Sequence, residues 1–170
     1  MKHIAFVLSA GLLALISSPA AAQTSTTGPK AQATVNVNKP LQLTAIRDLV
    51  FGTVLVGSFT GTQTVTIATS GRTCGTGAGL TCSGTFSTAQ FRVVGSNNNV
   101  ALISSPTPTV NLTNGTGGTL ALTLSYPASV IVDNSGNPGR IFEVGGSLPF
   151  TSTMADGVYT GTIDIQVAYQ

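Results

Sequence analysis

The segment Gly157–Gln170 reads G-V-Y-T-G-T-I-D-I-Q-V-A-Y-Q and decides the fold class. Five of its large apolar residues share one parity: Tyr159, Ile163, Ile165, Val167 and Tyr169. The polar residues of the other parity are Thr160, Thr162, Asp164 and Gln166. Because side chains on a β-strand alternate between two faces, the pattern predicts one strand with an apolar face and a polar face. Chain ends usually fray, so an end this regular predicts a strand that is paired on both sides or bound by a partner.

The rest of the sequence contains further short runs of strand type and no run with helical spacing. The predicted strands are 49–56, 63–69, 89–94, 99–103, 109–112, 119–126, 130–132, 141–144 and 148–151. Glycine, asparagine and aspartate clusters separate them, such as Gly95–Asn99 and Asn114-Gly115, and these are typical turn residues. Many short strands at this spacing predict an all-β, antiparallel immunoglobulin-like β-sandwich, with a barrel as the second choice.

A second alternating segment lies near the other end of the chain. Ala31, Ala33, Val35 and Val37 share one parity, with polar residues between them. Lys39-Pro40 interrupts the alternation, because proline cannot donate a hydrogen bond to a β-ladder. The pattern predicts an extended segment at 31–38 that is separate from the strand starting near Leu41.

The first residues have the features of a secretory signal peptide. Lys2 and His3 precede the apolar run 4–16, and Ala20-Ala21-Ala22 is a typical cleavage site. We therefore expect 1–22 to be a signal peptide, 23–38 an N-terminal extension, and 39–170 the β-sandwich domain. Export would place the protein in the periplasm and then at the cell surface or outside the cell. The apolar run is too short for an ordinary membrane span, and the chain has no second long one.

Cys74 and Cys82 are the only cysteines. Exported proteins pass through an oxidising compartment, so a disulfide is expected between them. It would close the glycine-rich loop between residues 74 and 82.

The composition excludes several classes of function. The only histidine, His3, lies in the predicted signal peptide, so the mature chain lacks a Ser-His-Asp or Cys-His catalytic set. Two cysteines without a histidine do not supply the usual set of about four zinc ligands. Without Lys2, six basic residues face five acidic ones, a balance too small to indicate nucleic acid as a partner. The sequence therefore predicts a protein that is not an enzyme and carries no cofactor or metal.

Five carboxylates remain: Asp48, Asp133, Glu143, Asp156 and Asp164. A glycosidase pair of Asp133 and Glu143 is formally open, although nothing in the sequence brings them together. The run 133–137 is similar to a calcium loop but lacks its spacing and closing glutamate, so a plain turn is the main interpretation.

The order of several short motifs resembles one exported bacterial family, domain of unknown function 4402. The residues that carry the resemblance are Ala33–Leu43, Asp48–Val54, Phe91–Gly95, Val144–Leu148 and Gly157–Gly161. They are spread over most of the predicted mature chain, and their order is more specific than any one of them. The family's name assigns no function.

The two alternating segments also resemble those of chaperone–usher pilus subunits. In such subunits the last strand carries a glycine fourteen residues from the end and a penultimate tyrosine, which Gly157 and Tyr169 match. The resemblance implies an immunoglobulin-like fold that lacks one strand, which the N-terminal extension of a neighbour supplies. Ala31, Ala33, Val35 and Val37 would be that donor strand. The cysteines depart from the pilin pattern, in which they are widely spaced.

The resemblance implies a structural subunit of a surface filament. Its partners would be copies of itself or related subunits, with a periplasmic chaperone and an outer-membrane usher during assembly. The alternative is a self-contained secreted or surface-associated β-sandwich, with residues 31–38 as the first strand of its own sheet. Such a domain would have a binding or structural function.

Overall fold

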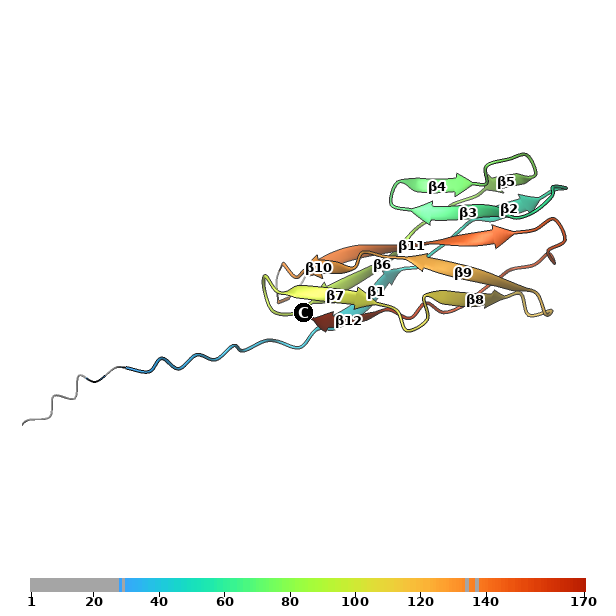
Figure 1. Ribbon diagram of the computed structural model, residues 1–170. Coiled ribbons are helices and arrows are strands. Elements are labelled where there is room, and N and C mark those ends of the chain that lie inside the picture. Colours follow the sequence, from blue (N-terminus) through green and yellow to red (C-terminus); the bar gives the residue numbers. More distant parts are fainter. Residues whose placement is uncertain (1–27, 29, 134, 137) are drawn as a thin grey trace, which may run out of the picture. The chain divides into compact units, whose positions relative to one another are not determined.

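The computed structural model describes residues 28, 30–133, 135–136 and 138–170. The chain divides into two units, Met1–Asn36 and Val37–Gln170, and every strand lies in the second (Figure 1). All paired strands are antiparallel and the described residues contain no helix, so the predicted all-β antiparallel fold is confirmed. The predicted signal peptide, residues 1–22, lies outside the described residues.

The strands are short, apart from one. They are β1 Gln42–Arg47, β2 Thr53–Val56, β3 Gln63–Ala68, β4 Gly71–Cys74, β5 Leu80–Ser83, β6 Ala89–Val94, β7 Val100–Ser104, β8 Thr109–Thr113, β9 Thr119–Ser125, β10 Ser129–Ile131, β11 Arg140–Phe150 and β12 Gln166–Tyr169. The largest sheet runs β1-β6-β11-β3-β4, with β9 paired to β11 and β8 paired to β9. Two smaller sheets have the orders β10-β7-β12 and β2-β5.

One hydrophobic core lies between the sheets. Alternate residues of β6 and β9 are buried, among them Phe91, Val93, Leu120 and Leu122. The rings of Phe91 and Phe142 stack with their centroids 5.7 Å apart, which joins β6 to β11 inside this core. Alternate residues of β7, which belongs to the smaller β10-β7-β12 sheet, are buried as well. Period-two burial on strands of different sheets is the arrangement of a β-sandwich.

The long strand β11 corrects one prediction. The sequence suggests a turn at Gly145-Gly146 between two strands, yet β11 continues through both glycines. The first half of β11 pairs with β6, and the second half pairs with β3 and β9. A side chain at position 145 would collide with the backbone of Ile67, and one at 146 with Leu122. The glycines therefore allow neighbouring strands to approach closely, which is a known reason for glycine inside a strand.

The predicted disulfide between Cys74 and Cys82 is confirmed. It ties β4, at the edge of the largest sheet, to β5 of the β2-β5 pair, with a Cα–Cα distance of 5.9 Å. Both strands were missed in the sequence, because their four-residue runs contain few apolar residues and are flanked by glycine. The disulfide therefore links two sheets as well as closing the loop at 75–81.

Replacing both cysteines with serine is expected to lower the free energy of unfolding by roughly 2–3 kcal/mol, because the loop closed by the disulfide is short. Urea unfolding of the oxidised protein and of the Cys74→Ser/Cys82→Ser variant measures this difference. Reduced wild-type protein should unfold at the same urea concentration as the variant. Equal midpoints for the oxidised protein and the variant would contradict the prediction.

Residues 30–40 form no strand, and all of them are exposed to solvent. The exposed fractions of Val35 and Val37 are 81% and 84%, the highest among the large hydrophobic residues of the described chain. The regular ladder begins only at β1, after Pro40.

Candidate functional site

The alternation predicted for the segment 157–170 is present in the structure. Its inward residues are half-buried against the core: Tyr159, Ile163, Ile165, Val167 and Tyr169. The residues between them, including Thr160, Thr162, Asp164 and Gln166, are exposed. The faces of this segment were therefore predicted correctly.

The same segment is not one continuous strand. Only β12 is paired, to β7, and a single bridge joins Thr160 to Thr113 at the end of β8. Between β7 and β8 lie Pro106 and Pro108, which have no N–H to donate to a ladder. There the Ser105 hydroxyl bonds to the carbonyl of Asp164 at 2.7 Å. The gap in pairing at 161–165 follows from these prolines.

No strand of the described chain pairs with the other edge of this segment. The N–H groups of Thr160 and Gln170 donate hydrogen bonds to backbone carbonyls of β8 and β7, respectively. Because backbone groups of successive residues point to opposite edges of an extended chain, those of Gly161, Ile163 and Ile165 point the other way. These three have no hydrogen-bond partner among the described residues. An unpaired row of this kind is a template for strand addition.

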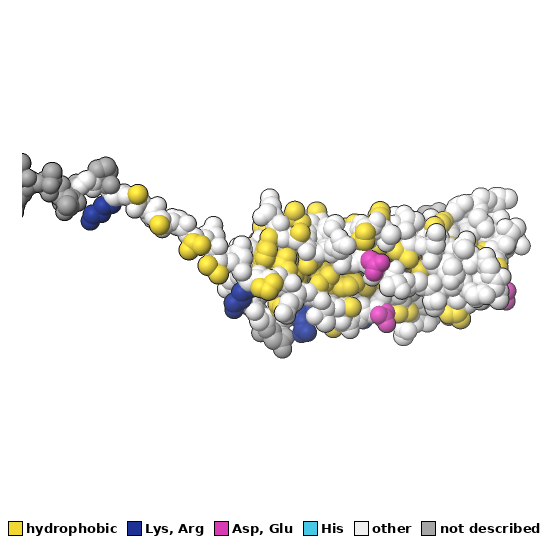
Figure 2. All heavy atoms as spheres, turned by 90° about the horizontal axis from the view of Figure 1, so that it is seen from below, with side chains coloured by type: hydrophobic (Ala, Val, Ile, Leu, Met, Phe, Trp, Pro, Cys, Tyr) yellow, Lys and Arg dark blue, Asp and Glu magenta, His cyan; other side chains and the backbone are white. Residues whose placement is uncertain are grey.

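A groove lies beside this free edge. One rim is the segment Asp48–Val56 and the other is the segment 154–163. The groove has a volume of about 910 Å³, and its apolar floor consists of Leu112, Leu120, Leu122, Leu148 and Phe150. We call it the seam groove. Figure 2, seen from below Figure 1, shows a band of hydrophobic side chains over the part of the domain that contains β1 and β12, two strands that do not themselves line the groove.

The rim at 48–56 also pairs only on its far side. Val50 forms a two-bond bridge with Ser87, and β2 pairs with β5. The apolar residues of this rim that pack against the core are Leu49, Phe51, Val54 and Val56, and all four are only half-buried. Core-facing residues of a closed sandwich are normally buried. Half-burial along both rims indicates that the sandwich is open at this seam.

Asn114 fixes one end of the C-terminal rim. Its side-chain carbonyl accepts hydrogen bonds from the N–H groups of Thr116 and Gly118, and its amide donates to the carbonyl of Asp156 at 3.0 Å. Gly157 has a φ of 136° and packs on the Asn114 side chain. Gly157 therefore adopts, near the start of this rim, a backbone conformation that other residues avoid.

Tyr169 fixes the other end of the segment. Its hydroxyl group accepts a hydrogen bond from the Ser96 N–H and donates one to the carbonyl of Lys39, each at 2.6 Å. Both ends of the C-terminal segment are thus held, while the stretch from Gly161 to Ile165 keeps its outward backbone groups unpaired.

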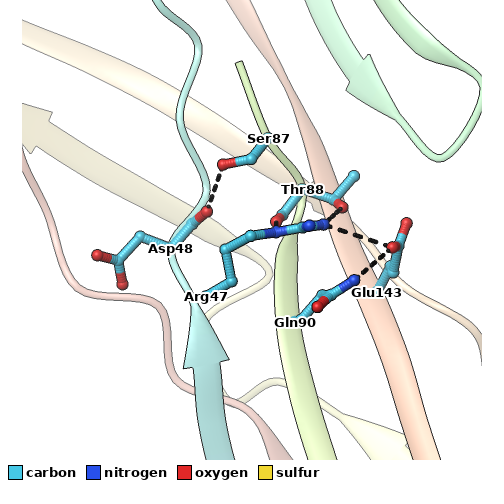
Figure 3. A network of polar contacts seen from close by, with 6 residues as sticks. All are labelled: Arg47, Asp48, Ser87, Thr88, Gln90 and Glu143. Carbon is cyan, nitrogen blue, oxygen red and sulfur yellow. Dashed lines mark hydrogen bonds and ion pairs between the residues drawn. The ribbon is translucent and has the colours of Figure 1, made fainter. Parts of the chain in front are cut away.

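The two carboxylates considered for catalysis have separate structural partners. Asp133 forms an ion pair with Arg140 at 2.9 Å. Glu143 accepts a hydrogen bond from Gln90 at 2.8 Å and lies 3.4 Å from Arg47 (Figure 3). Among the described residues no group of three or more metal-binding side chains occurs. Two residues of the calcium-like turn, 134 and 137, lie outside the described part of the chain.

Figure 3 shows how the polar network around Glu143 is built. The Arg47 side chain crosses toward Glu143 and donates to the backbone carbonyl of Thr88 at 2.9 Å and to its hydroxyl at 2.8 Å. The carboxylate of Asp48 points away from this network. The hydrogen bond from Gln90 is the main reason that the pKa of Glu143 lies below its usual 4.5, with smaller contributions from Thr88 and Arg47. Burial has a weaker, opposing effect.

The lowered pKa of Glu143 predicts a small dependence of stability on pH. Folding favours its ionised form, so this stabilisation is complete well above pH 4.5 and is lost as the pH falls through the lower pKa of the folded state. The effect should stay below about 1 kcal/mol, because solvent screens the partly exposed pair. The Glu143→Gln variant should therefore lose less stability than wild type between pH 5 and pH 3 (about one unit on each side of the usual carboxyl pKa), measured by thermal unfolding. An equal or larger loss in the variant would contradict this.

The seam groove itself was not predicted from the sequence. The run Leu49–Val56 is apolar on both parities, which indicates a buried strand, and the structure makes it a rim instead. The floor residues have ordinary core spacing on β8, β9 and β11. Only the pairing of the strands shows that each of the two rims has an edge with no strand paired to it.

The comparisons with known proteins assign a family and no activity. No curated protein and no solved structure matches the chain. No helix in the described residues is long and apolar enough to cross a membrane. The model of one family matches residues 41–169, from the residue before β1 to the last residue of β12. This chain belongs to the family described as a domain of unknown function, DUF4402.

Proposed function

We propose that the protein is a non-enzymatic structural subunit of a bacterial surface filament, similar to a pilus or fimbria, and that it assembles by β-strand addition. Residues 31–37 of one copy enter the seam groove of the next copy and complete its sandwich. The observation that carries the proposal is the open seam, which has two rims without a strand between them and an apolar floor. Strand addition to an unpaired edge is an established mode of recognition.

The N-terminal extension has the pattern that such a groove would bind. Ala31, Ala33, Val35 and Val37 would face the floor, and the polar residues between them would face solvent. Seven residues of strand span roughly 23 Å, which suits a groove whose rims are about as many residues long. The family match begins at Leu41, so the extension lies outside the part of the chain that the family model matches. This division of the chain supports a separate role for the extension.

Completion of the seam offsets the cost of ordering the extension. Ordering seven residues costs about 1–2 kcal/mol for each residue. Against this stand the hydrogen bonds to two rims, about 1 kcal/mol each, and burial of apolar surface on both sides of the seam. Leu49, Phe51 and Ile163 would pass from half-buried to buried. All of these contacts must break together for the strand to leave, so dissociation should be very slow.

The same open edge explains the partners that we propose for assembly. Before assembly, the unpaired row at 161–165 and the apolar groove would be an aggregation hazard. A periplasmic chaperone would therefore cover the edge during transit, and an outer-membrane usher would exchange it for the extension of the next subunit. Export through the proposed signal peptide at 1–22 fits this route.

A second candidate is a self-contained secreted or surface-associated β-sandwich with a binding or structural function. One observation favours it: the floor residues Leu120, Leu122 and Leu148 are already less than a tenth exposed without an inserted strand. Such a domain would be stable as a monomer.

An unheated denaturing gel separates the two candidates. The mature protein, recovered from the periplasm or cell surface, is compared with a variant that lacks residues 23–38. Strand-exchanged polymers predict a detergent-resistant ladder that collapses to monomer on boiling and is absent from the truncated variant. A single monomer band from folded full-length protein would overturn the filament proposal and favour the self-contained domain. Circular dichroism confirms that both samples are folded.

A further inference from the structure

The hydroxyl group of Tyr169 connects three parts of the fold that are far apart in the sequence. It lies on β12, in the β10-β7-β12 sheet. It donates to the carbonyl of Lys39, just before β1, and accepts from the N–H of Ser96, just after β6. Both β1 and β6 belong to the other, largest sheet. One phenol group therefore bridges the two sheets and also holds the residue at which the N-terminal extension joins the domain.

Other hydrogen bonds converge on the same junction. The N–H of Lys39 donates to the hydroxyl of Ser96 at 2.6 Å, and Asn99 donates to the side chain of Asn38 at 3.0 Å. A side chain at Gly95 would collide with the Tyr169 hydroxyl and with Leu41, so glycine makes room for this contact. We call Asn38, Lys39, Ser96 and Tyr169 the root joint.

The position of the root joint matters because β1 is an edge strand. Among the described strands it pairs only with β6, beginning at Gln42 opposite Val94. A pull on the extension would therefore reach the domain at the start of the β1–β6 ladder. The root joint lies ahead of that ladder, and its bonds to Tyr169 and Ser96 spread such a pull over both sheets.

We propose that Tyr169 is a positioning residue that anchors the root of the N-terminal extension to both sheets, and that this joint transmits tension between successive subunits. The anchoring rests on the observed hydrogen bonds alone, and the transmission of tension rests on the proposed function. Replacing Tyr169 with phenylalanine keeps the ring on the core and removes only the hydroxyl. Tyr159→Phe is the matched control, because it removes a hydroxyl that bonds to the carbonyl of Ala155, away from the joint.

The anchoring is tested by amide hydrogen exchange on the folded monomer, with chains lacking residues 23–36 so that polymerisation does not interfere. These chains keep Val37–Gln170, which is a separate unit of the structure. Tyr169→Phe should speed exchange about tenfold at Ser96 and over 41–44, with little change elsewhere, because two bonds at the joint are lost. Ser96→Ala should have the same local effect over 41–44 and add little to it in the double variant. Unchanged exchange in Tyr169→Phe, or equal acceleration in Tyr159→Phe, would overturn the anchoring.

The transmission of tension is tested on full-length polymers stretched by atomic force microscopy. Polymers of Tyr169→Phe should extend at lower force than those of wild type and of Tyr126→Phe. Tyr126 is the control for polymers because it belongs neither to the root joint nor to the lining of the seam groove. Equal forces for all three would overturn this part of the proposal, while the filament proposal would stand. If wild-type protein forms no polymer, the proposed function and the tension role both fail, and hydrogen exchange still decides the anchoring.

Discussion

Val35→Asp is expected to abolish polymer formation and to leave the folded domain unchanged. Val35 is 81% exposed and belongs to no strand, so the substitution removes no contact of the folded monomer. In an assembled filament the aspartate would lie on the apolar floor of the seam groove, and none of the described residues that line this groove is cationic. Burial of an unpaired carboxylate costs several kcal/mol, which corresponds to a loss of affinity of more than about a thousandfold.

The control for this prediction is Asn36→Asp. It adds the same charge one residue further along, on the face of the donor strand that would point to solvent. This variant should polymerise close to the wild-type level, and the unheated gel measures all three proteins side by side. Polymer at normal yield from Val35→Asp would refute strand insertion in this register. Equal loss in both variants would point to a general effect of charge on the extension.

The sequence was sufficient for the fold class and for the faces of the strands. Period-two alternation was reliable wherever one face meets the core, as at β9 and at the inward residues Ile163 and Val167. The disulfide could be predicted because Cys74 and Cys82 have no other partner. These features depend on local pattern and on simple chemistry, which a single sequence carries.

Pairing between strands could not be predicted from local pattern. The segment 161–165 has strong strand character, but its neighbour on one side contains Pro106 and Pro108, far away in the sequence. The sequences of β4 and β5 lack a clear alternating pattern. These strands are held by their pairing with β3 and β2 and by the disulfide. The seam groove is the consequence of many such pairings at once, which explains why only the structure reveals it.

Moving the extension to the other end of its own chain is expected to give a stable monomer. In this variant, residues 30–38 are removed from the N-terminus and follow Gln170 through a flexible linker of about eight residues. After the linker, the appended strand would run back along the segment 163–157 and pair antiparallel with its free edge, above the floor of the seam groove. The linker passes the part of the segment between Tyr169 and Ile165, beyond the residues that line the groove.

Insertion within one chain lowers the entropy cost of bringing the strand to the groove, because the linker holds the strand at millimolar effective concentration. We expect a gain of several kcal/mol over the chain that merely lacks residues 23–38, which should raise the melting temperature by about 10 °C or more. Calorimetry measures the shift, and the unheated gel should give one monomer band. The same variant with Val35→Asp in the appended strand is the control and should melt like the truncated chain. If the appended wild-type strand does not raise the melting temperature, the seam groove does not bind it. The self-contained domain then becomes the better account, because a sandwich that is already complete has no free edge for another strand.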